Sequence, residues 1–480
     1  MLPFYGFSQT PTLTIDPTLI TTLAGNLPGF SNASGSNAQF NLPTGITTDP
    51  SGNIYIADYN NNVIRKITPV GVVTTFAGTG VYGFLDGAGS VARFRSPTGI
   101  TSDQVGNIYV ADQFNHKIRK ISPSGVVSSV AGDGLNGYVN GTAANARFNF
   151  PTCLAVDLSG NLYVADQYNH VIRKISSLGI VSTLAGSGVS GFKDDIGTLA
   201  QFNLPTGIAV DSNGLVYVAD YNNNRIRKIT ATGIVTTLAG TGIAGAVDGA
   251  GNQASFYNPT GVFADALQNI YVADKNNLKI RKISPLGLVS TIAGSGSWGA
   301  DDGMGLIAKF GDPYNIAKDI SGNFYVADAN NHRVRKISTL QLDPFITPQN
   351  TASAAEQFLI SGRNLTNNVL ITPPVGYQIS LDGSSYSSSL ILSPINGEVA
   401  KIIFIRLSAN ASVGNSSGNI SIASTGAVSL SLAVNGTVTG TPFSAFTVTN
   451  NSCLNRTVSF TDLSSLATSW LWNFGDGTTS

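Results

Sequence analysis

The feature that most constrains this chain is an internal repeat. A phenylalanine returns every 54 residues, and a proline and a tyrosine recur at the same interval at fixed positions after it. The six phenylalanines are Phe40, Phe94, Phe148, Phe202, Phe256 and Phe310. The prolines run from Pro43 to Pro313 and the tyrosines from Tyr55 to Tyr325. A fixed period of this length is typical of repeat architectures, so the sequence predicts six copies of one supersecondary unit.

Each copy contains four short segments with the composition of β-strands. In copy one they are residues 44–48, 54–57, 63–67 and 72–76, and β-branched and aromatic residues are enriched in them. The turns between them carry Asp, Asn, Pro and Gly, which favour tight reversals of the chain. The sequence therefore predicts a four-stranded antiparallel sheet in every copy and an all-β protein.

The ends of the repeat indicate how the copies are arranged. A lone sheet of this kind leaves its faces uncovered, so the copies must stack, either in an open solenoid or in a closed ring. Copy six stops after its third strand, at Ile337, and residues 19–25 before copy one match the strand that it lacks. We expect this N-terminal strand to complete the last sheet and close the ring, since closure removes the exposed edges.

The residue pattern of the repeat resembles that of a known family. The segment Ile54–Asp58, followed in sister copies by Asn115-His116, Asn169-His170 or Asn331-His332, is similar to the NHL repeat. The resemblance extends over roughly residues 18–340 and implies a six-bladed β-propeller. It implies no single activity, because propellers of this type include RNA-binding modules, adhesive or sensor ectodomains and a metal-dependent lyase.

Three further segments flank the repeats. Residues 1–17 read as an N-terminal extension. Residues 345–438 predict a β-sandwich and resemble the Ig-like modules of secreted, surface-attached bacterial proteins. Residues 443–480 resemble the first half of a PKD domain, an extracellular spacer, and we expect the natural protein to continue beyond them.

Composition favours an extracellular or cell-surface protein. Only 11% of the residues are charged, against roughly 25% in ordinary soluble domains. Lys+Arg and Asp+Glu are equal at 27 each, which argues against a nucleic-acid partner. The sequence contains no apolar run long enough for membrane insertion and no recognisable signal peptide, and we expect a monomer.

Residues that recur in every copy are interpreted as scaffold. Asp58 and its equivalents suit turns, and Arg65 and its equivalents suit struts between blades. The three histidines, His116, His170 and His332, lie too far from the ring axis to converge on one zinc ion. The long loops carry acids that could bind calcium, namely Asp86, Asp194, Asp195, Asp248, Asp301 and Asp302. Their spacing is not that of a calcium loop, a turn assisted by glycine is the favoured interpretation, and no cofactor is expected.

Specificity is expected where copy six departs from the other five. The long connection that precedes each first strand defines the candidate binding face. A tryptophan beside polar groups at a ring mouth suits a glycan or peptide ligand, although adaptation of copy six to the closure seam is an equal alternative. The candidate ligand-binding residues are Trp298, Asp312, Tyr314, Asn315, Lys318 and Arg95.

The functional prediction is a non-catalytic binding or adhesion protein whose partner is an extracellular glycan, protein or peptide. The alternative is a metal-dependent lyase or hydrolase acting at the central channel. The repeats contain no glutamate, so acid or base chemistry there would have to use aspartate. An RNA-binding role ranks third, because the long loops carry more aspartate than lysine or arginine.

Overall fold

The computed structural model describes residues 11–16, 18–339, 342, 344–440, 445–450 and 458–465. These residues form strands and short 3-10 turns, with no α-helix in the described part of the chain. They separate into two compact units, one within Thr18–Thr339 and the other within the flanking ranges Met1–Pro17 and Leu340–Ser480. The first unit contains the repeats.

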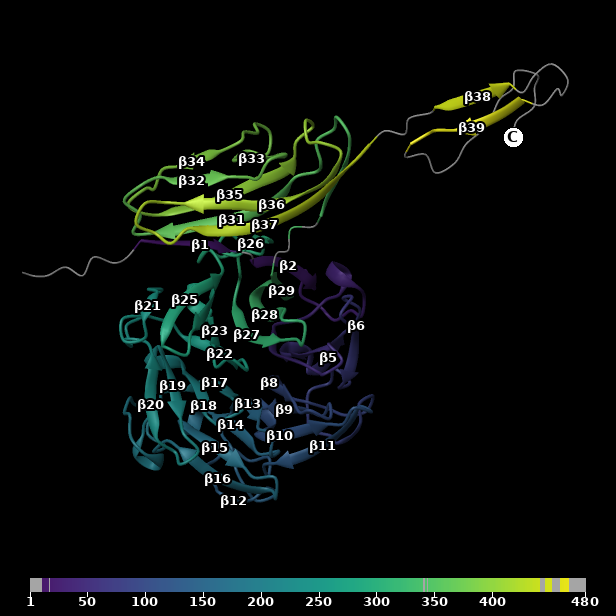
Figure 1. The fold of residues 1–480 in the computed structure, drawn as a ribbon. Helices are drawn as coiled ribbons and strands as arrows, with labels where there is room; N and C mark the ends of the chain where they lie inside the picture. Colours follow the sequence, from purple (N-terminus) through teal and green to yellow (C-terminus); the bar gives the residue numbers. More distant parts are fainter. Residues whose placement is uncertain are drawn as a thin grey trace, which may run out of the picture. The chain divides into compact units, whose positions relative to one another are not determined.

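The repeats form six small antiparallel sheets, one for each copy (Figure 1). Copy one has β3 (Pro43–Thr48), β4 (Ile54–Asp58), β5 (Val63–Ile67) and β6 (Val73–Ala77). Copy two has β8 (Pro97–Ser102), β9 (Ile108–Asp112), β10 (Lys117–Ile121), β11 (Val126–Ala131) and the short outer strand β7 (Gly87–Ala88). Copy three has β13 (Pro151–Val156), β14 (Leu162–Asp166), β15 (Val171–Ile175), β16 (Ile180–Ala185) and β12 (Gly141–Thr142).

The remaining three copies follow the same plan. Copy four has β17 (Pro205–Val210), β18 (Val216–Asp220), β19 (Arg225–Ile229) and β20 (Val235–Ala239). Copy five has β22 (Pro259–Ala264), β23 (Ile270–Asp274), β24 (Lys279–Ile283), β25 (Leu288–Ala293) and β21 (Gly249–Ala250). Copy six has β27 (Pro313–Lys318), β28 (Phe324–Asp328), β29 (Arg333–Thr339) and β26 (Gly303–Met304).

The N-terminal strand β2 (Thr18–Ala24) supplies the missing strand of copy six. It pairs antiparallel with β29, with Ile20 opposite Ile337, and on its other side with β26. This is the place that the repeat predicts for residues 19–25. The inner strands β3, β8, β13, β17, β22 and β27 contact one another in that order, and β27 contacts β3, so the sheets close a ring.

Packing between consecutive sheets explains why the strands are apolar on both faces. All five residues of β4 are buried, as they are in β14, β18 and β23. One hydrophobic cluster joins copies three and four through Ala155, Ala165, Ile208 and Val218. The recurring phenylalanine, for example Phe202, is fully buried in every copy. Strands covered on both faces need near-continuous apolar runs, and this sequence supplies them.

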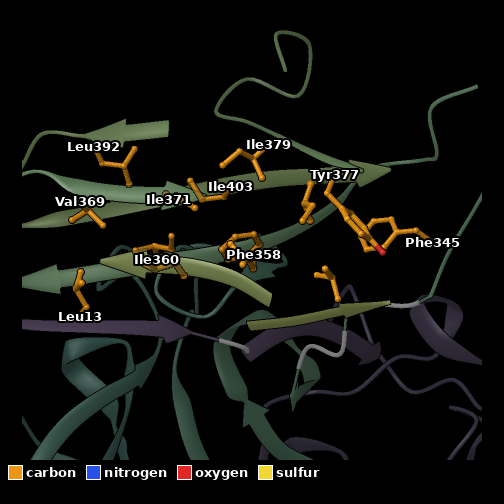
Figure 2. Packing of buried hydrophobic residues seen from close by; sticks show 14 of the residues in the cluster. Leu13, Phe345, Phe358, Ile360, Val369, Ile371, Tyr377, Ile379, Leu392 and Ile403 are labelled. Carbon is orange, nitrogen blue, oxygen red and sulfur yellow. The ribbon is translucent and has the colours of Figure 1, made fainter. Parts of the chain in front are cut away.

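The second unit is a two-sheet β-sandwich. One sheet has the order β1 (Thr12–Asp16), β31 (Glu356–Arg363), β35 (Val399–Leu407) and β33 (Tyr377–Ser380). The other has the order β30 (Phe345–Pro348), β37 (Leu430–Thr439), β36 (Gly414–Ala423), β32 (Val369–Thr372) and β34 (Leu390–Leu392). Figure 2 shows side chains of both sheets, including Leu13, Ile360 and Val369, meeting in one core.

Strand β1 belongs to the sandwich, which the sequence did not predict for residues 1–17. These residues read as an extension, whereas Thr12–Asp16 pairs antiparallel with Leu359–Arg363 as an edge strand of the sandwich. A five-residue strand whose partner lies more than 300 residues away leaves no local signal. The Ig-like assignment of residues 345–438 stays a prediction.

The C-terminal segment is described only in part. Strands β38 (Phe446–Asn450) and β39 (Val458–Asp462) form an antiparallel hairpin. The remainder of the PKD-like prediction, including residues 470–477, lies outside the described residues.

Candidate functional site

The two ends of the ring differ in their connections. In copy one, Pro43 at the start of the inner strand lies opposite Asp58, and Thr48 at its end lies opposite Ile54. The long connections and the 3-10 turns after each second strand therefore share one end of the ring, here called the long-loop face. The tight turns after each inner strand share the other end, called the short-turn face.

A buried ion pair recurs in each copy beneath the long-loop face. In copy one, Arg65 Nη1 donates to Asp58 Oδ2 at 2.9 Å, and neither side chain is exposed. Asp58 also accepts from Asn61 Nδ2 and from the backbone N–H of Asn41. Burial raises the pKa of Asp58 to about 6, so the carboxylate is charged at neutral pH. The equivalent pairs are Asp112–Arg119, Asp166–Arg173, Asp220–Arg227, Asp274–Arg281 and Asp328–Arg335.

These arginines hold the long connections of their own copies, which differs from the predicted role as struts between blades. Arg65 donates to the backbone oxygens of Gln39 and Ser31, both in the connection before β3. Phe30, from the same connection, covers the guanidinium at 5.1 Å. The interaction within the copy follows from the position of the arginine on the third strand, over which the connection folds back.

The acidic residues of the long connections are engaged in the same way. Asp86 Oδ1 accepts from Arg119 Nη2 at 2.6 Å, and Asp194, Asp248 and Asp302 bind Arg227, Arg281 and Arg335 equivalently. These four aspartates belong to the acidic loop residues considered for calcium, and each already has a cationic partner. The other two acids of those loops, Asp195 and Asp301, pair with Lys193 and Lys309. The described residues contain no group of three or more His, Cys, Asp or Glu side chains placed to hold a metal ion.

The histidines that resemble the family motif join neighbouring sheets. His170 has left-handed backbone geometry, with φ of 53°, and its Nδ1 accepts from the backbone N–H of Leu204 in the next copy at 3.1 Å. His116 and His332 bind Phe150 and Leu42 in the same manner, and Asn62 and Asn224 replace histidine in two other copies. Only copy five lacks an acceptor at this position, because it has Leu278 there.

We expect the pH dependence of stability to reveal this histidine bond. Burial lowers the pKa of His170, so the unfolded chain, with a histidine pKa near about 6.5, binds the proton more readily. The stability from neutral His170 is therefore present above about pH 6.5 and is lost as the pH falls below it. In urea titrations, wild type should lose stability relative to His170→Asn as the pH falls from 7 to 5.

The matched variants come from sister copies. His170→Asn keeps an acceptor, as Asn224 does, and should stay close to wild type at pH 7. His170→Leu mimics Leu278, leaves the Leu204 N–H unpaired and should cost about 1 kcal/mol or more at pH 7. A difference between wild type and His170→Asn that does not change with pH would contradict the assignment.

The ring axis is closed by the inner strands. Thr44 Oγ1 donates to the backbone oxygen of Thr98, and the equivalent threonines of copies two to five bind the next strand likewise. Glycine follows threonine in four copies, and a Cβ at Gly45 would collide with the Thr98 oxygen. The two exceptions are Cys153 and Asn315, both buried, and Asn315 Nδ2 lies 4.0 Å from Cys153 Sγ. Copies three and six are opposite in a ring of six, so these side chains plug the axis.

Copies five and six interrupt the pattern together on the long-loop face. Asp312 is 7% exposed, and its Oδ1 has no hydrogen-bond partner among the described residues. Its Oδ2 lies 3.4 Å from Lys275 Nζ, which also lies 5.5 Å from the centre of the Tyr314 ring. The pKa of Asp312 is raised to about 6, chiefly by burial; Lys275 lowers it in part, and the nearby Asp328 adds to the rise. The three residues are here called the Lys275 cluster.

Tyr314 places this cluster near the axis. It occupies the position of the ring-closing threonines. Burial raises the pKa of its hydroxyl, and proximity to Asp312, Cys153, Tyr59 and Tyr221 raises it further. Tyr59 comes from η2 (Tyr59–Asn61) of copy one and Tyr221 from η6 (Tyr221–Asn223) of copy four. Tyrosines of copies one and four therefore lie near the Tyr314 hydroxyl.

The six predicted ligand-binding residues do not form one group. Asp312 and Tyr314 lie together, whereas Asn315 belongs to the axial plug. Lys318 ends β27 and lies at the short-turn face, 3.9 Å from Asp265 Oδ2. Trp298 is 67% exposed on a long connection. Arg95 lies in copy two, 5.8 Å from the rings of both Tyr82 and Phe114.

The prediction from the sequence did not include two residues near the axis, Lys275 and Cys153, although both depart from the repeat. Lys275 begins η7 (Lys275–Asn277), where the other copies have Tyr, Gln or Ala. Cys153 stands where four copies have glycine. Both would have emerged from comparing all six copies position by position, since each side chain differs from every equivalent.

A cavity of about 190 Å³ lies on the other side of the plug, toward the short-turn face. The ends of all six inner strands line it, and Cys153 and Asn315 contribute from the plug. Thr48, Ser102 and Lys318 form its polar side, and Val156, Val210 and Ala264 its apolar side. It adjoins a second hollow of about 190 Å³, with which it shares those three apolar residues.

Comparisons with known proteins agree with this architecture. Residues 40–67, 148–175 and 202–229 match the NHL repeat. The chain is 30% identical over 275 residues to Protein SUPPRESSOR OF QUENCHING 1, chloroplastic, of Arabidopsis thaliana, covering 53% of this chain and 26% of that protein. It is 29% identical over 352 residues to NHL repeat-containing protein 2 of Gallus gallus, covering 64% and 48%. The chain thus spans less than half of either relative.

Solved structures show the same fold. A structural genomics protein of unknown function from Bacteroides thetaiotaomicron superposes with a TM-score of 0.54 at 20% identity, over 67% of this chain and 76% of that one. An auxiliary nutrient binding protein from Bacteroides ovatus gives 0.52 at 18% identity, with the same coverages. Together with the repeat matches, these likenesses support an NHL-type β-propeller.

Proposed function

We propose that this protein is a non-catalytic binding or adhesion protein of the extracellular space or cell surface. Its six-bladed NHL propeller presents the long-loop face to a glycan or peptide ligand, and the C-terminal domains, Ig-like and PKD-like, act as spacers. No helix in the described residues is long and apolar enough to cross a membrane. A binding role agrees with the name of the auxiliary nutrient binding protein that shares the fold.

The observation that carries this proposal is the Lys275 cluster. The recurring acids, arginines and histidines make scaffold contacts. Among the described residues, the buried side-chain atoms without a hydrogen-bond partner are Asp312 Oδ1, the one oxygen of the group, and the Nε atoms of Arg65, Arg173, Arg333, Arg335 and Arg406. A buried polar atom without a partner is costly, and such atoms in a stable fold call for an explanation. A ligand hydroxyl or amide that reaches Asp312 after Lys275 moves would supply the missing donor, and Tyr314 would supply a ring to pack against.

The test is binding of the full chain to glycan and peptide arrays. Asp312→Asn, Lys275→Gln and Tyr314→Thr should each lower the affinity for the bound ligand by roughly tenfold to a hundredfold, because each removes a charge-assisted contact or a packing surface. Tyr314→Thr restores the residue of the other copies. Lys228→Gln removes an equal charge from a recurring position and should leave binding unchanged.

Two outcomes would contradict the proposal. If binding survives all three cluster variants, the ligand binds elsewhere on the protein. Trp298→Ala would then test the long connection that precedes copy six. The alternative function, a metal-dependent lyase or hydrolase, predicts stoichiometric metal in the purified protein. Loss of such a metal on replacing Asp302 or His170 would favour that alternative.

A further inference from the structure

The cavity on the short-turn side of the plug is separate from the Lys275 cluster and has its own chemistry. It is lined by residues 46–48, 100–102, 153–156, 208–210, 262–264 and 315–318. At roughly 30 Å³ for each water, its volume of about 190 Å³ would hold about six waters. This is the size of a small organic molecule rather than of a sugar chain or a peptide.

The polar side of the cavity comes from copies six, one and two. Thr48 Oγ1 donates to the Lys318 backbone oxygen at 2.8 Å, and Ser102 Oγ donates to the Thr48 backbone oxygen at 2.7 Å. The hydrogens of both hydroxyls are thereby used. Lys318 Nζ, in contrast, makes no hydrogen bond to any described residue. It forms a long ion pair with Asp265 Oδ2 at 3.9 Å and lies 5.0 Å from the centre of the Phe324 ring and 5.9 Å from that of Tyr271, so its N–H donors are still available to a ligand.

Lys318 adds one positive charge to the short-turn face, where the recurring positive and negative charges are otherwise equal in number. Each copy places one aspartate at its short turn, from Asp49 to Asp319, and one lysine on its third strand, from Lys66 to Lys336. In copy one, Tyr55 joins them, donating to Asp49 Oδ2 while Lys66 lies over its ring at 5.7 Å. Lys318 has no counterpart, because the equivalent positions hold Thr, Ser, Val or Ala.

The apolar side faces this amine from copies three, four and five. Val156, Val210 and Ala264 stand where copies one and two have hydroxyl residues. The inner end of the cavity, formed by Cys153 and Asn315, needs no polar partner from a ligand. Asn315 Nδ2 points to Cys153 Sγ, and Asn315 Oδ1 accepts from the Ile316 N–H. A molecule that fits must therefore be apolar along one side and at its inner end.

We propose that this cavity is a second binding site, which takes a small monocarboxylate with a short hydrocarbon chain. The carboxylate pairs with the Lys318 ammonium at the rim, and the hydrocarbon packs on Val156, Val210 and the Cys153 floor. A dicarboxylate would bring a second charge to the apolar side, and an alkylammonium would meet Lys318 as a like charge. The chemistry therefore selects one negative charge on an apolar body.

The test uses 3-methylbutanoate as the probe with the full-length protein. Calorimetry and ligand-observed NMR should detect saturable binding at millimolar concentrations, with 3-methylbutanamide and 3-methylbutylamine binding at least tenfold more weakly. Lys318→Gln should lower the affinity for 3-methylbutanoate by roughly tenfold to a hundredfold. Lys228→Gln, at a recurring position, should have no effect.

A second variant and a second readout guard against misfolding. The double variant Val156→Thr/Val210→Thr installs the copy-one residue at both positions, preserves shape and should weaken the probe several-fold. In a Cys453→Ser background, 3-methylbutanoate should slow the reaction of Cys153 with a small thiol reagent, and Lys318→Gln should abolish that protection.

Clear results would overturn the proposal. Equal binding of the acid and the amide, or an unchanged affinity in a folded Lys318→Gln variant, would exclude recognition of the charge. Absence of binding by all three probes would leave the cavity without this role. None of these results bears on ligand binding at the long-loop face, since the two sites lie on opposite sides of the plug.

Discussion

Replacing Arg173 by alanine should reduce the free energy of unfolding of the ring by about 3–5 kcal/mol. The substitution leaves the Asp166 carboxylate, at 0% exposure, without its cationic partner at 2.8 Å. It also removes the donors to the backbone oxygens of Arg147 and Val139. A charge that remains buried and unpaired is far more costly than the pair itself is stabilising. Urea denaturation of the full-length protein measures the loss.

Two controls separate this effect from a general loss of side-chain volume. Lys174→Ala changes the neighbouring residue, whose amine lies 5.5 Å from the Tyr163 ring, and should cost less than about 1 kcal/mol. Asp166→Asn combined with Arg173→Met removes both charges and should be less destabilising than Arg173→Ala alone. A loss below about 1 kcal/mol for Arg173→Ala would show that the pair is not essential to the scaffold.

Removing strand β2 should have a still larger effect, because it opens the ring. A chain that starts at residue 25 lacks the strand between β26 and β29, and it exposes both edges together with the apolar partners of Ile20. We expect aggregation or loss of the cooperative unfolding transition of the ring. Size-exclusion chromatography and thermal unfolding monitored by circular dichroism measure these outcomes.

A chain that starts at residue 18 is the matched comparison. It keeps β2 and loses only β1, so the ring should retain its transition while the sandwich is weakened. If the chain from residue 25 unfolded as cooperatively as the chain from residue 18, the ring would not depend on closure by its N-terminal strand.

The fold of the ring could be predicted from the sequence because every level of its structure repeats. The period of 54 residues aligns the strands, and the incomplete sixth copy implies where residues 19–25 belong. The sandwich strands were also recognisable from their composition. Strand β1 was not, since its pairing with β31 depends on contact between distant segments rather than on a local pattern.

The candidate site was predictable only in part. Departures from the repeat direct attention to copy six, but sequence position does not reveal the direction of a side chain along an inner strand. Asp312 begins the strand region on one face and Lys318 ends it on the other, so six residues of separation place them at opposite ends of the ring. Asn315, midway between them, closes the axis with a residue of the opposite copy.

The sandwich contains both β1, which precedes the ring in the chain, and β30 to β37, which follow it. The propeller is therefore an insertion within another domain, and this affects synthesis and proteolysis. At about 5–20 residues per second, β1 would wait roughly 20–70 s for β31 to be made, and the ring could fold in that interval. A single cleavage in either connection would leave the two units joined through the other, so releasing the ring requires two cuts.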